Sequence, residues 1–432
     1  MGKFKKIFGN IKIESLAKET KFMIRKPKKI TPENFLYSFY LLFSAKIFSL
    51  DAWAIEFEKL TGIEITSQAI DKKLQIRHIE FYKKLFEEAI KTSYTKLISK
   101  VEGKLARFNR VLVEDSTCVK LADKLYKFFS GASNGMVKKA ITRIQFSFDL
   151  KSNTYENLEM CTYTQNDGFY SEKIIKRAKK GDLILRDLGY WNLKVFGKLI
   201  TKGAYILSRY KLNTKVYNTN KEEIDLVKLL RKLERKGIRQ FDEMVYIGSE
   251  KKLKFRILGQ KLTDAQLEKK MRAAKKNAYK KRAINKRTKY LMSWNLLITN
   301  VEEKIWSVKD AFQVYGFRWS IEMMFKNWKS TFKIDLLLQT TKSENPYRPG
   351  ALLYLSLTYL ALIFQPKFNS WYKKIKAKFD KELSPIKFGK YISRELKDFW
   401  DYTEDYLFST LSRFCCYAKR KDRSNLFELL YC

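Results

Sequence analysis

The chain has 432 residues, 45% of them hydrophobic, and a formal net charge of +42 from 88 Lys and Arg against 46 Asp and Glu. This length allows two or three domains, and the hydrophobic share excludes a chain that is disordered throughout. The positive charge predicts a polyanionic partner, and nucleic acid fits best because binding phosphates releases counterions. A ribosomal or membrane-surface protein could share the charge, but neither would need the motifs described below.

Cysteine and histidine are too scarce for several kinds of site. The five cysteines contain no CxxC pair and would leave one over from any disulfide scheme, which predicts a reduced, intracellular protein with no zinc site. The single histidine, His78, is interpreted as a surface helix residue, and Ser-His-Asp or Cys-His catalysis has no basis. The N-terminus lacks a signal-peptide core, and the apolar stretches 35–50 and 352–364 are too short or too interrupted to span a bilayer. We therefore expect a soluble, cytoplasmic protein without a membrane partner.

The first part of the chain, residues 1–107, reads as a helical DNA-binding domain. Pro32 opens a segment whose apolar residues recur at helical spacing. After a break at Gly62, Ser67 is a candidate N-cap for a second helix over 68–74. Helix, short turn and helix is the helix-turn-helix pattern, whose second helix can enter a major groove, although such pairs are often mere packing.

From residue 108 the pattern changes to short apolar runs that predict buried strands. Two of these runs, 111–113 and 183–185, end in acidic positions at Asp115 and Asp187. Further strands are predicted at 141–150, 156–164 and 204–210, with a helix at 172–179. Strands mixed with helices favour an α/β sheet for residues 108–345.

Residues 211–300 interrupt that sheet as an insertion. They hold a charged helix at 222–236, a hairpin pairing 244–247 with 254–258, and an apolar strand at 290–299 that contains Trp294. The run 269–289 is rich in Lys and Arg and has no acid, so we interpret it as a DNA-facing arm rather than a plain solvated surface. Residues 346–432 are predicted to be helical, a candidate region for dimerisation.

Residues 314–333 predict one amphipathic helix. Its polar face carries the side chains Tyr315, Arg318, Trp319, Glu322, Lys326 and Lys329. A solvated face with Glu–Lys pairs would explain this helix if it stood alone. Two acids at strand ends and a third on a later helix are, however, what a divalent-metal site for phosphoryl transfer requires. Mg²⁺ prefers carboxylate oxygens, two ions about 4 Å apart can activate the attacking and leaving oxygens, and nearby cations can hold phosphates.

At these residues the sequence resembles a known family. The segments 113–117 and 186–191, together with the Tyr315, Arg318, Glu322, Lys329 spacing, look like the three blocks of the DDE transposases of bacterial insertion sequences, in the branch with the YREK signature. The resemblance covers about residues 108–335. It implies a ribonuclease H-like core with a β-containing insertion before the catalytic glutamate.

The resemblance also implies roles for individual residues. Asp115, Asp187 and Glu322 would be catalytic and would bind two Mg²⁺ ions, with Mn²⁺ as a substitute. Contacts to DNA are implied for Tyr315, Arg318, Lys329, Trp294, Trp319, Arg209 and Lys326. Trp294 would hold a base flipped during hairpin formation and Trp319 would be a second stacking partner, since stacking offsets the cost of unstacking.

Three neighbouring acids are not expected in the site. Glu114 should point to the opposite face of its strand from Asp115. Asp149 and Asp182 lack the apolar run or the Gly-Tyr turn that marks the other two positions.

The activity expected from the resemblance is cut-and-paste transposition through a hairpin intermediate. The partners would be double-stranded DNA, as transposon ends and target, and a second copy of the chain, with the protein on the bacterial nucleoid when bound. The alternatives are a related endonuclease that does not rejoin strands and a catalytically silent repressor.

Overall fold

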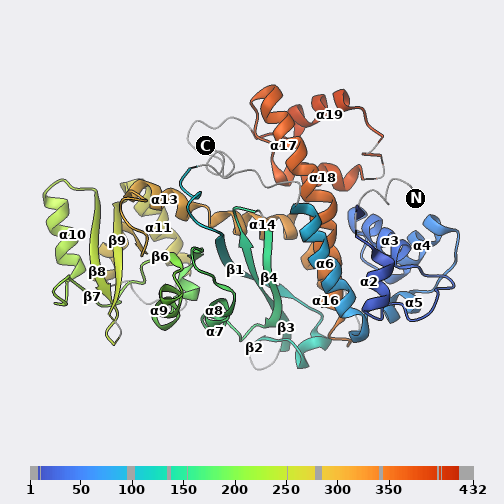
Figure 1. Ribbon diagram of the computed structural model, residues 1–432, viewed down its shortest axis with the longest axis horizontal. Helices are drawn as coiled ribbons and strands as arrows, with labels where there is room; N and C mark the ends of the chain where they lie inside the picture. The colour runs from blue at the N-terminus through green and yellow to red at the C-terminus, as the bar shows by residue number, and fades with distance from the viewer. Residues whose placement is uncertain are drawn as a thin grey trace.

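The computed structural model describes residues 8–9, 11–94, 103–133, 138–152, 154–250, 252–277, 285–339, 344–396, 398–399 and 401–417. Its centre is a ten-stranded mixed sheet; the N-terminal helices lie beyond one end of it, and the strands of residues 211–300 form its other end (Figure 1). The strands are β1 (Val111–Lys120), β2 (Ser130–Ser133), β3 (Lys138–Asp149), β4 (Thr154–Thr162), β5 (Leu183–Arg186), β6 (Tyr205–Arg209), β7 (Val216–Tyr217), β8 (Gln240–Ile247), β9 (Leu253–Lys261) and β10 (Trp294–Thr299).

The sheet order explains where the acids of the first two motifs lie. The strands run in the order β2-β3-β1-β5-β6-β10-β9-β8-β7, and β4 also pairs with β3. β1, β5 and β6 are parallel, while β3 and β4 continue the sheet in antiparallel pairs. An antiparallel unit joined to three parallel strands is the ribonuclease H-like core. Parallel neighbours end at the same edge of a sheet, so the residues that follow the apolar runs of β1 and β5 lie side by side.

The two faces of the sheet are covered by different cores. Val113 and Leu185 face the larger core, which contains the helices α14 (Trp319–Ser330) and α15 (Ile334–Gln339). Leu112 and Ile184 face the smaller core under the helices α8 (Ile174–Arg177) and α9 (Leu193–Thr201). Alternation along a strand therefore assigns Asp115 and Glu114 to opposite faces.

The insertion does not form a separate sheet. β10 pairs with β6, and β9, β8 and β7 add to it in turn, so the insertion lengthens the catalytic sheet at its far edge (Figure 1). The predicted hairpin is confirmed, with Met244 opposite Arg256. The helices here are α10 (Leu226–Arg235), α11 (Asp264–Asn277) and α12 (Lys286–Leu291). The predicted strand at 290–299 is wrong in its first part, because Tyr290 belongs to α12. The middle of the basic run, 278–284, lies outside the described residues.

The N-terminal helices are α2 (Ile13–Glu19), α3 (Pro32–Ala45), α4 (Leu50–Thr61), α5 (Ser67–Asp71) and α6 (Ile79–Tyr94). Pro32 opens α3 as predicted, behind the Thr31 cap. The cap of α5 is Thr66 rather than Ser67, and α5 passes into a tighter 3₁₀ turn at Lys72. The expectation that His78 is a surface helix residue was wrong: its side chain is 3% exposed and packs edge-on against the ring of Phe22.

The C-terminal helices are α16 (Arg348–Tyr359), α17 (Gln365–Phe379), α18 (Pro385–Arg394) and α19 (Glu404–Thr410), which follow α13 (Val308–Gly316), α14 and α15. α16 packs on α6 and α3, so the N-terminal and C-terminal helices share the larger core with the sheet.

One expectation about this region was wrong. The segment Arg348–Phe379 is a helix of 32 residues, long and apolar enough to cross a membrane, whereas the sequence had suggested an interrupted stretch. A π-helical turn at Leu360–Phe364 carries the helix past Pro366, which lacks the N–H that a regular turn would use. Of its most apolar window, 78% is buried inside the protein.

Candidate active site

Asp115 and Asp187 come from neighbouring parallel strands. In the β1–β5 register Glu114 lies beside Arg186, so the next residue along each strand is the acid of interest. The Asp115 backbone is still within β1, whereas Asp187 follows the last residue of β5 and opens the turn Leu188–Tyr190. Both side chains are half-buried. The local sequence therefore delivers two carboxylates to one edge of the sheet.

Glu322 reaches the same place from α14. The Arg318 guanidinium lies between the acids: its Nη2 donates to Glu322 Oε1 at 2.5 Å, and its Nη1 is 3.5 Å from Asp115 Oδ2. Arg318 is only 7% exposed. A buried arginine that contacts two carboxylates from distant segments brings the first and third motifs into one cluster.

The expected single helix over 314–333 was wrong in one respect. Tyr315 lies on α13 and Glu322 on α14, and the two helices are separated at Phe317 and Arg318. Both residues keep helical backbone angles, but their N–H groups bond three residues back instead of four. Tyr315 and Arg318 still contact the sheet edge, whereas Trp319 and Lys326 are exposed.

The charge state of Asp115 reflects this crowding. The pKa of the Asp115 carboxyl is raised to about 6, first because burial disfavours its ionised form and then because the neighbouring Asp187 and Glu322 are negatively charged. A hydrogen bond from the Ser116 backbone and the Arg318 charge lower the pKa, but only in part. Carboxylates that approach each other with too little positive charge between them favour an added cation.

The donor set fits a hard divalent ion. All three side chains offer carboxylate oxygens, which Mg²⁺ and Mn²⁺ prefer, and none offers nitrogen or sulfur. Within the ranges that the structure describes, no three Asp, Glu, His or Cys side chains are gathered as closely as one bound ion would hold them. Arg318 contacts two of the three acids, so its guanidinium would have to move aside for an ion to be held there.

Tyr315 and Arg209 adjoin the acids. The Tyr315 hydroxyl donates to the Arg186 carbonyl at 3.3 Å, one residue before Asp187, and the side chain is 8% exposed. The Arg209 and Arg318 guanidinium groups lie 5.8 Å and 5.9 Å from the Tyr315 ring centroid. Burial raises the pKa of Tyr315 to about 12, which keeps the hydroxyl protonated. Here this hydroxyl holds the end of β5, and its expected phosphate contact stays a prediction.

The remaining cations of the third motif lie along the same helix. Lys329 Nζ donates to the Cys118 carbonyl of β1 at 3.0 Å, which ties the end of α14 to the strand that carries Asp115. Lys326 is exposed, and so is Trp319, at 55%. Both can meet a ligand that approaches the cluster from solvent.

Trp294 is the predicted site residue that the structure does not bring to the site surface. Its side chain is 1% exposed and packs against Phe241 of β8 within the smaller core. β10 is covered by side chains on both faces, so an indole on it fills the sheet interior. The expected stacking on a flipped base requires an open ring face, and this placement contradicts it.

The three acids set aside from the sequence have other partners. Glu114 points to the smaller core, as the strand alternation predicts, and is 2% exposed. Asp149 accepts from the Val111 backbone at 2.8 Å, and Asp182 pairs with Arg110 at 2.6 Å.

Arg186, for which no role was expected from the sequence, forms the main buried ion pair beside the site. It is fully buried and donates through Nε and Nη2 to Glu114 Oε2, at 2.8 Å and 2.6 Å. Two further hydrogen bonds go to Ser171, and Arg177 donates to the other Glu114 oxygen at 2.9 Å. An arginine inside an apolar strand is the signal that could have revealed this buried pair.

A second polar group, centred on Asp167, links the two segments that carry Asp115 and Asp187. Asp167 Oδ1 accepts hydrogen bonds from Ser116 Oγ at 2.7 Å and from Gln145 Nε2 at 3.1 Å. Gln145 in turn accepts from the Tyr190 hydroxyl at 2.6 Å. This chain of bonds links the residue after Asp115 to the turn after Asp187, and nothing in the local sequence around Asp167 marks it.

The basic run 269–289, which we call the basic arm, contacts the sheet through Lys270 on α11. Its ammonium donates to the Trp294 carbonyl at 3.2 Å and lies 3.4 Å from Asn295 Oδ1. Burial, together with the Arg209 charge, lowers the pKa of Lys270 to about 8. The arm therefore starts on the catalytic sheet, near Arg209.

Comparisons with known proteins agree with this geometry. The family described as "Transposase DDE domain" matches residues 106–342. The chain is 28% identical over 464 residues to the transposase for insertion sequence element IS1151 of Clostridium perfringens, covering 99% of this chain and 94% of that protein. It is 27% identical over 351 residues to the transposase for IS231F of Bacillus thuringiensis subsp. israelensis, covering 77% and 72%.

Among solved structures, the chain is similar to the piggyBac transposase synaptic complex with hairpin DNA, at 11% identity and a TM-score of 0.40, over 97% of this chain and 86% of that one. The family match spans more than half of the chain and includes the strands and helices that carry Asp115, Asp187 and Glu322. The protein belongs to the DDE-domain transposases and is an enzyme of the bacterial insertion-sequence type.

Proposed function

We propose that Asp115, Asp187 and Glu322 are the metal-binding catalytic acids and that the chain excises and inserts an insertion sequence. The observation that carries the proposal is the pairing of one buried arginine, Arg318, with acids of the first and third motifs. Asp187 lies beside them at the sheet edge, because it follows the parallel strand β5, whose Arg186 is in register with Glu114.

Two divalent ions, Mg²⁺ or in its place Mn²⁺, would supply activation of the attacking oxygen and stabilisation of the leaving oxygen. The chain's own contribution is position and charge. Three carboxylates on two strands and a helix fix where the reacting phosphate lies, and Ser116, Asp167 and Gln145 hold two of those segments together.

DNA ends are recognised by the cations that surround the acids. With ions bound, Arg318 no longer has to neutralise Asp115 and Glu322, so its planar guanidinium can bind a phosphate through two hydrogen bonds. Lys329, Lys326 and Arg209 add charge on the same side. Arg318 therefore alternates between acids and DNA, which couples substrate binding to ion binding.

Excision through a hairpin fits the exposed Trp319. The 3′-hydroxyl released by the first cut would attack the opposite strand across a sharply bent end, and a base near that end must leave the stack. Trp319 is adjacent to Arg318 and more than half exposed, so a displaced base can stack on it. A homodimer holding two ends would then join them to target DNA on the nucleoid.

The test is incubation of the purified protein with DNA that carries the element's own ends and with plasmid target, with and without Mg²⁺ or Mn²⁺. We expect metal-dependent nicks, hairpin ends and strand-transfer products, two ions per chain by calorimetry, and end complexes with two chains. Asp115→Asn should bind ends without cutting, while Asp123→Asn, an exposed acid near the end of β1, should cut normally.

Each other outcome contradicts a definite part of the proposal. Cutting without strand transfer would identify an endonuclease, and binding without cutting would identify a repressor. Cutting that leaves open ends and no hairpin would remove the hairpin step. Normal cutting by Asp115→Asn would show that the wrong acid is assigned.

A further inference from the structure

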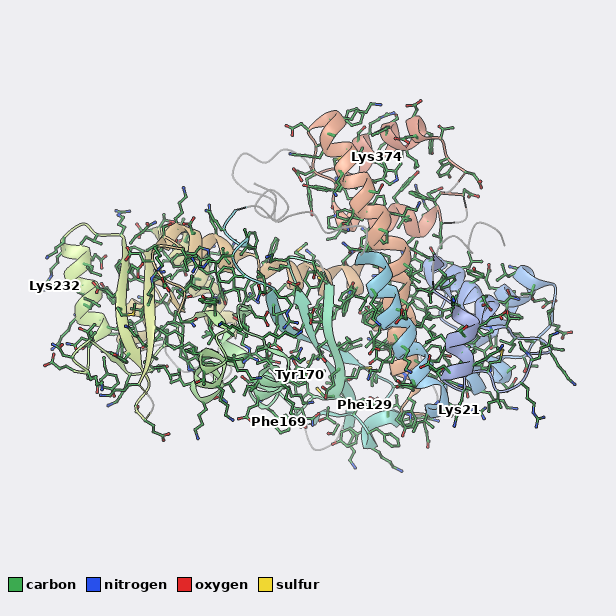
Figure 2. All side chains as sticks on the ribbon, in the orientation of Figure 1. Lys21, Phe129, Phe169, Tyr170, Lys232 and Lys374 are labelled. Atoms are coloured by element: carbon green, nitrogen blue, oxygen red, sulfur yellow. The ribbon has the colours of Figure 1, made fainter. Side chains whose placement is uncertain are left out.

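A cavity of about 450 Å³ lies within the N-terminal helices, far from the carboxylates. It opens between the segment that follows α2 and the turns that precede α6. Its lining consists of Lys21, Phe22, Met23, Ile24, Arg25, Pro27, Ile30, Pro32, Lys73, Arg77 and His78. Lys21 lies at the lower edge of these helices in the view of Figure 2. We call this cavity the N-terminal pocket.

The N-terminal pocket is cationic without compensation. Four of its lining residues are Lys or Arg, and none is acidic. Among the residues that the structure describes, no carboxylate forms an ion pair with Lys21, Arg25, Lys73 or Arg77, although other cations on these helices, such as Lys84, have acidic partners. Within the described residues, the positive charge of the pocket is therefore not neutralised by ion pairs.

Two of the cations are held in place by neutral partners. Lys73 Nζ donates to the Phe22 carbonyl at 3.1 Å and lies 4.4 Å from the centre of the Phe22 ring. Arg77 Nε donates to His78 Nε2 at 3.1 Å, which leaves the other guanidinium N–H groups for an acceptor. These contacts orient the charges without cancelling them, and a preorganised site loses less entropy on binding.

The electrostatic effect on neighbouring groups agrees with this description. The pKa of His78 is lowered to about 4, first by burial and then by the charges of Lys73 and Arg77. Burial and the Arg77 charge also lower the pKa of Lys73. A bound anion would relieve both effects, because its charge favours the protonated forms.

The rest of the lining is apolar and suits a sugar. Met23, Ile30 and Pro32 form part of the wall, and Ile24 is 82% exposed beside it. An anionic group flanked by a weakly polar ring is the repeating unit of a nucleic-acid backbone. Non-specific and positioning contacts to DNA are made to phosphate and sugar by residues of these kinds.

We propose that the N-terminal pocket binds a phosphodiester of duplex DNA, with the phosphate on Lys73 and Arg77 and the sugar against Ile24. The proposal rests on the proposed function in taking DNA as the substrate. α6 and α16 separate α2–α5 from the sheet (Figure 1), so the contact lies on the duplex away from the end that is cut. Backbone binding here differs from the expected entry of the helix at 68–74 into a major groove.

The experiment compares two double variants with a matched control. Lys73→Gln with Arg77→Gln removes the two held cations. Lys21→Gln with Arg25→Gln removes exposed cations of the same pocket and leaves its packing intact. Lys59→Gln with Lys83→Gln removes the same charge from exposed positions on the same helices. Binding to end DNA is measured over a range of salt, and melting temperatures report folding.

We expect the Lys73/Arg77 variant to reduce the slope of log K against log salt by about 0.9, since one phosphate contact is lost. At 0.1 M salt the affinity should fall roughly 10-fold by the same relation. The Lys21/Arg25 variant should show a smaller change in the same direction, and the control pair less than either. Ethylation of the contacted phosphates inside the end sequence should weaken binding of the wild type and of the control pair. It should no longer weaken binding of the pocket variants.

Three results would overturn the proposal. One is an unchanged slope in both pocket variants, and another is an equal change in the control pair. The third is competition by millimolar inorganic phosphate beyond its ionic strength, which would identify a free-phosphate site. Failure here is distinguishable from failure of the proposed function, because bound DNA would still be cut by the pocket variants and would not be cut by Asp115→Asn.

Discussion

Adjacent residues of β1, Glu114 and Asp115, form carboxylate–arginine pairs on opposite faces of the sheet, and the two pairs differ in every physical respect. Glu114 is buried and receives three hydrogen bonds, two from Arg186 and one from Arg177. Asp115 has one backbone hydrogen bond and a long contact to Arg318 at 3.5 Å. The satisfied pair belongs to the fold, and the unsatisfied one is available for a ligand.

The two pairs show how a ribonuclease H-like sheet can hold acids on both faces without losing stability. A buried charge is tolerated when its partner and hydrogen bonds are complete. Asp115 lies among like charges, and its raised pKa shows that the site disfavours its ionised form. A cation added from outside offsets that cost while Asp115 stays ionised. The Glu114–Arg186 pair stabilises one face of β1, while Asp115 on the other face stays without a complete set of partners.

The largest expected effect is on catalysis by Asp115→Asn. Loss of one metal ligand should slow cleavage by roughly 1,000-fold or more, since ion stabilisation of this transition state is worth several kcal/mol. End binding should persist, and in metal-free buffer the melting temperature should be no lower than that of the wild type. A variant that melts well below the wild type would show that Asp115 is structural, and the contrast with Glu114 would fail.

On the other face, Glu114→Gln should reduce the free energy of unfolding by about 3–5 kcal/mol, because it leaves Arg186 buried without its counter-charge. Denaturant unfolding measures this loss. Replacing both partners, with Glu114→Met and Arg186→Met together, should recover part of it. Glu302→Gln, which breaks an exposed pair with Lys304, should leave unfolding unchanged. If Glu114→Gln is as harmless as that control, the buried pair does not stabilise the fold.

The tryptophans extend the comparison from charges to rings. Trp294→Ala should destabilise the fold by about 3–5 kcal/mol and reduce nicking and hairpin formation together. Trp319→Ala should keep the fold and slow only hairpin formation, by roughly 10- to 100-fold, as loss of 1–3 kcal/mol of stacking implies. Separate measurement of nicking and hairpin formation on one DNA end distinguishes them. Equal losses of both steps in Trp319→Ala would exclude a base-holding role for it.

The smallest expected effect is the pH dependence of stability that His78 causes. His78 is a buried ionisable group like Glu114. Its folded-state pKa of about 4 lies below the ordinary 6.5, so the unfolded chain binds more protons between these values. Its contribution to stability is complete above pH 6.5 and is lost as the pH falls toward 4. Between pH 6.5 and 5 the loss should be about 2 kcal/mol, at 1.36 kcal/mol per unit.

Unfolding of wild type and His78→Gln at pH 5 and pH 7.5 isolates this residue from the carboxylates, which titrate in both proteins. The difference between the two proteins should shrink by that amount at pH 5. A difference that does not change with pH would mean that His78 is protonated in the folded protein.

Local sequence patterns were enough to predict most of the strands in the catalytic core. Apolar runs that end in acids predicted β1 and β5, and the hairpin of β8 and β9 was predicted from two alternating segments. These signals are reliable because buried parallel strands need side chains that are apolar on both faces. The assignment of Glu114 and Asp115 to opposite faces follows from the same two-residue period.

The predictions that were wrong concern residues whose burial depends on segments far away in the sequence. Trp294 was expected at the DNA surface, but strands from both sides of β10 and the ring of Phe241 enclose it. His78 was expected at the surface of a helix, and Phe22, more than fifty positions earlier in the sequence, covers it. The stretch 352–364 was expected to be too short or too interrupted to span a bilayer, but it lies within the continuous helix Arg348–Phe379, which a π-helical turn carries past Pro366.

Local periodicity was enough to predict the two strands that lead to Asp115 and Asp187 and the helical region that carries Glu322. Strand and helix periods are set by neighbouring residues, so a short stretch of sequence reveals them. The tertiary structure alone decided that Arg318 lies between Asp115 and Glu322, that Arg186 satisfies Glu114, and that the insertion lengthens the catalytic sheet. Those outcomes depend on which faces meet when the cores form. A buried charge such as Glu114 is tolerated when a partner completes its hydrogen bonds, and here that partner, Arg186, comes from a distant part of the chain.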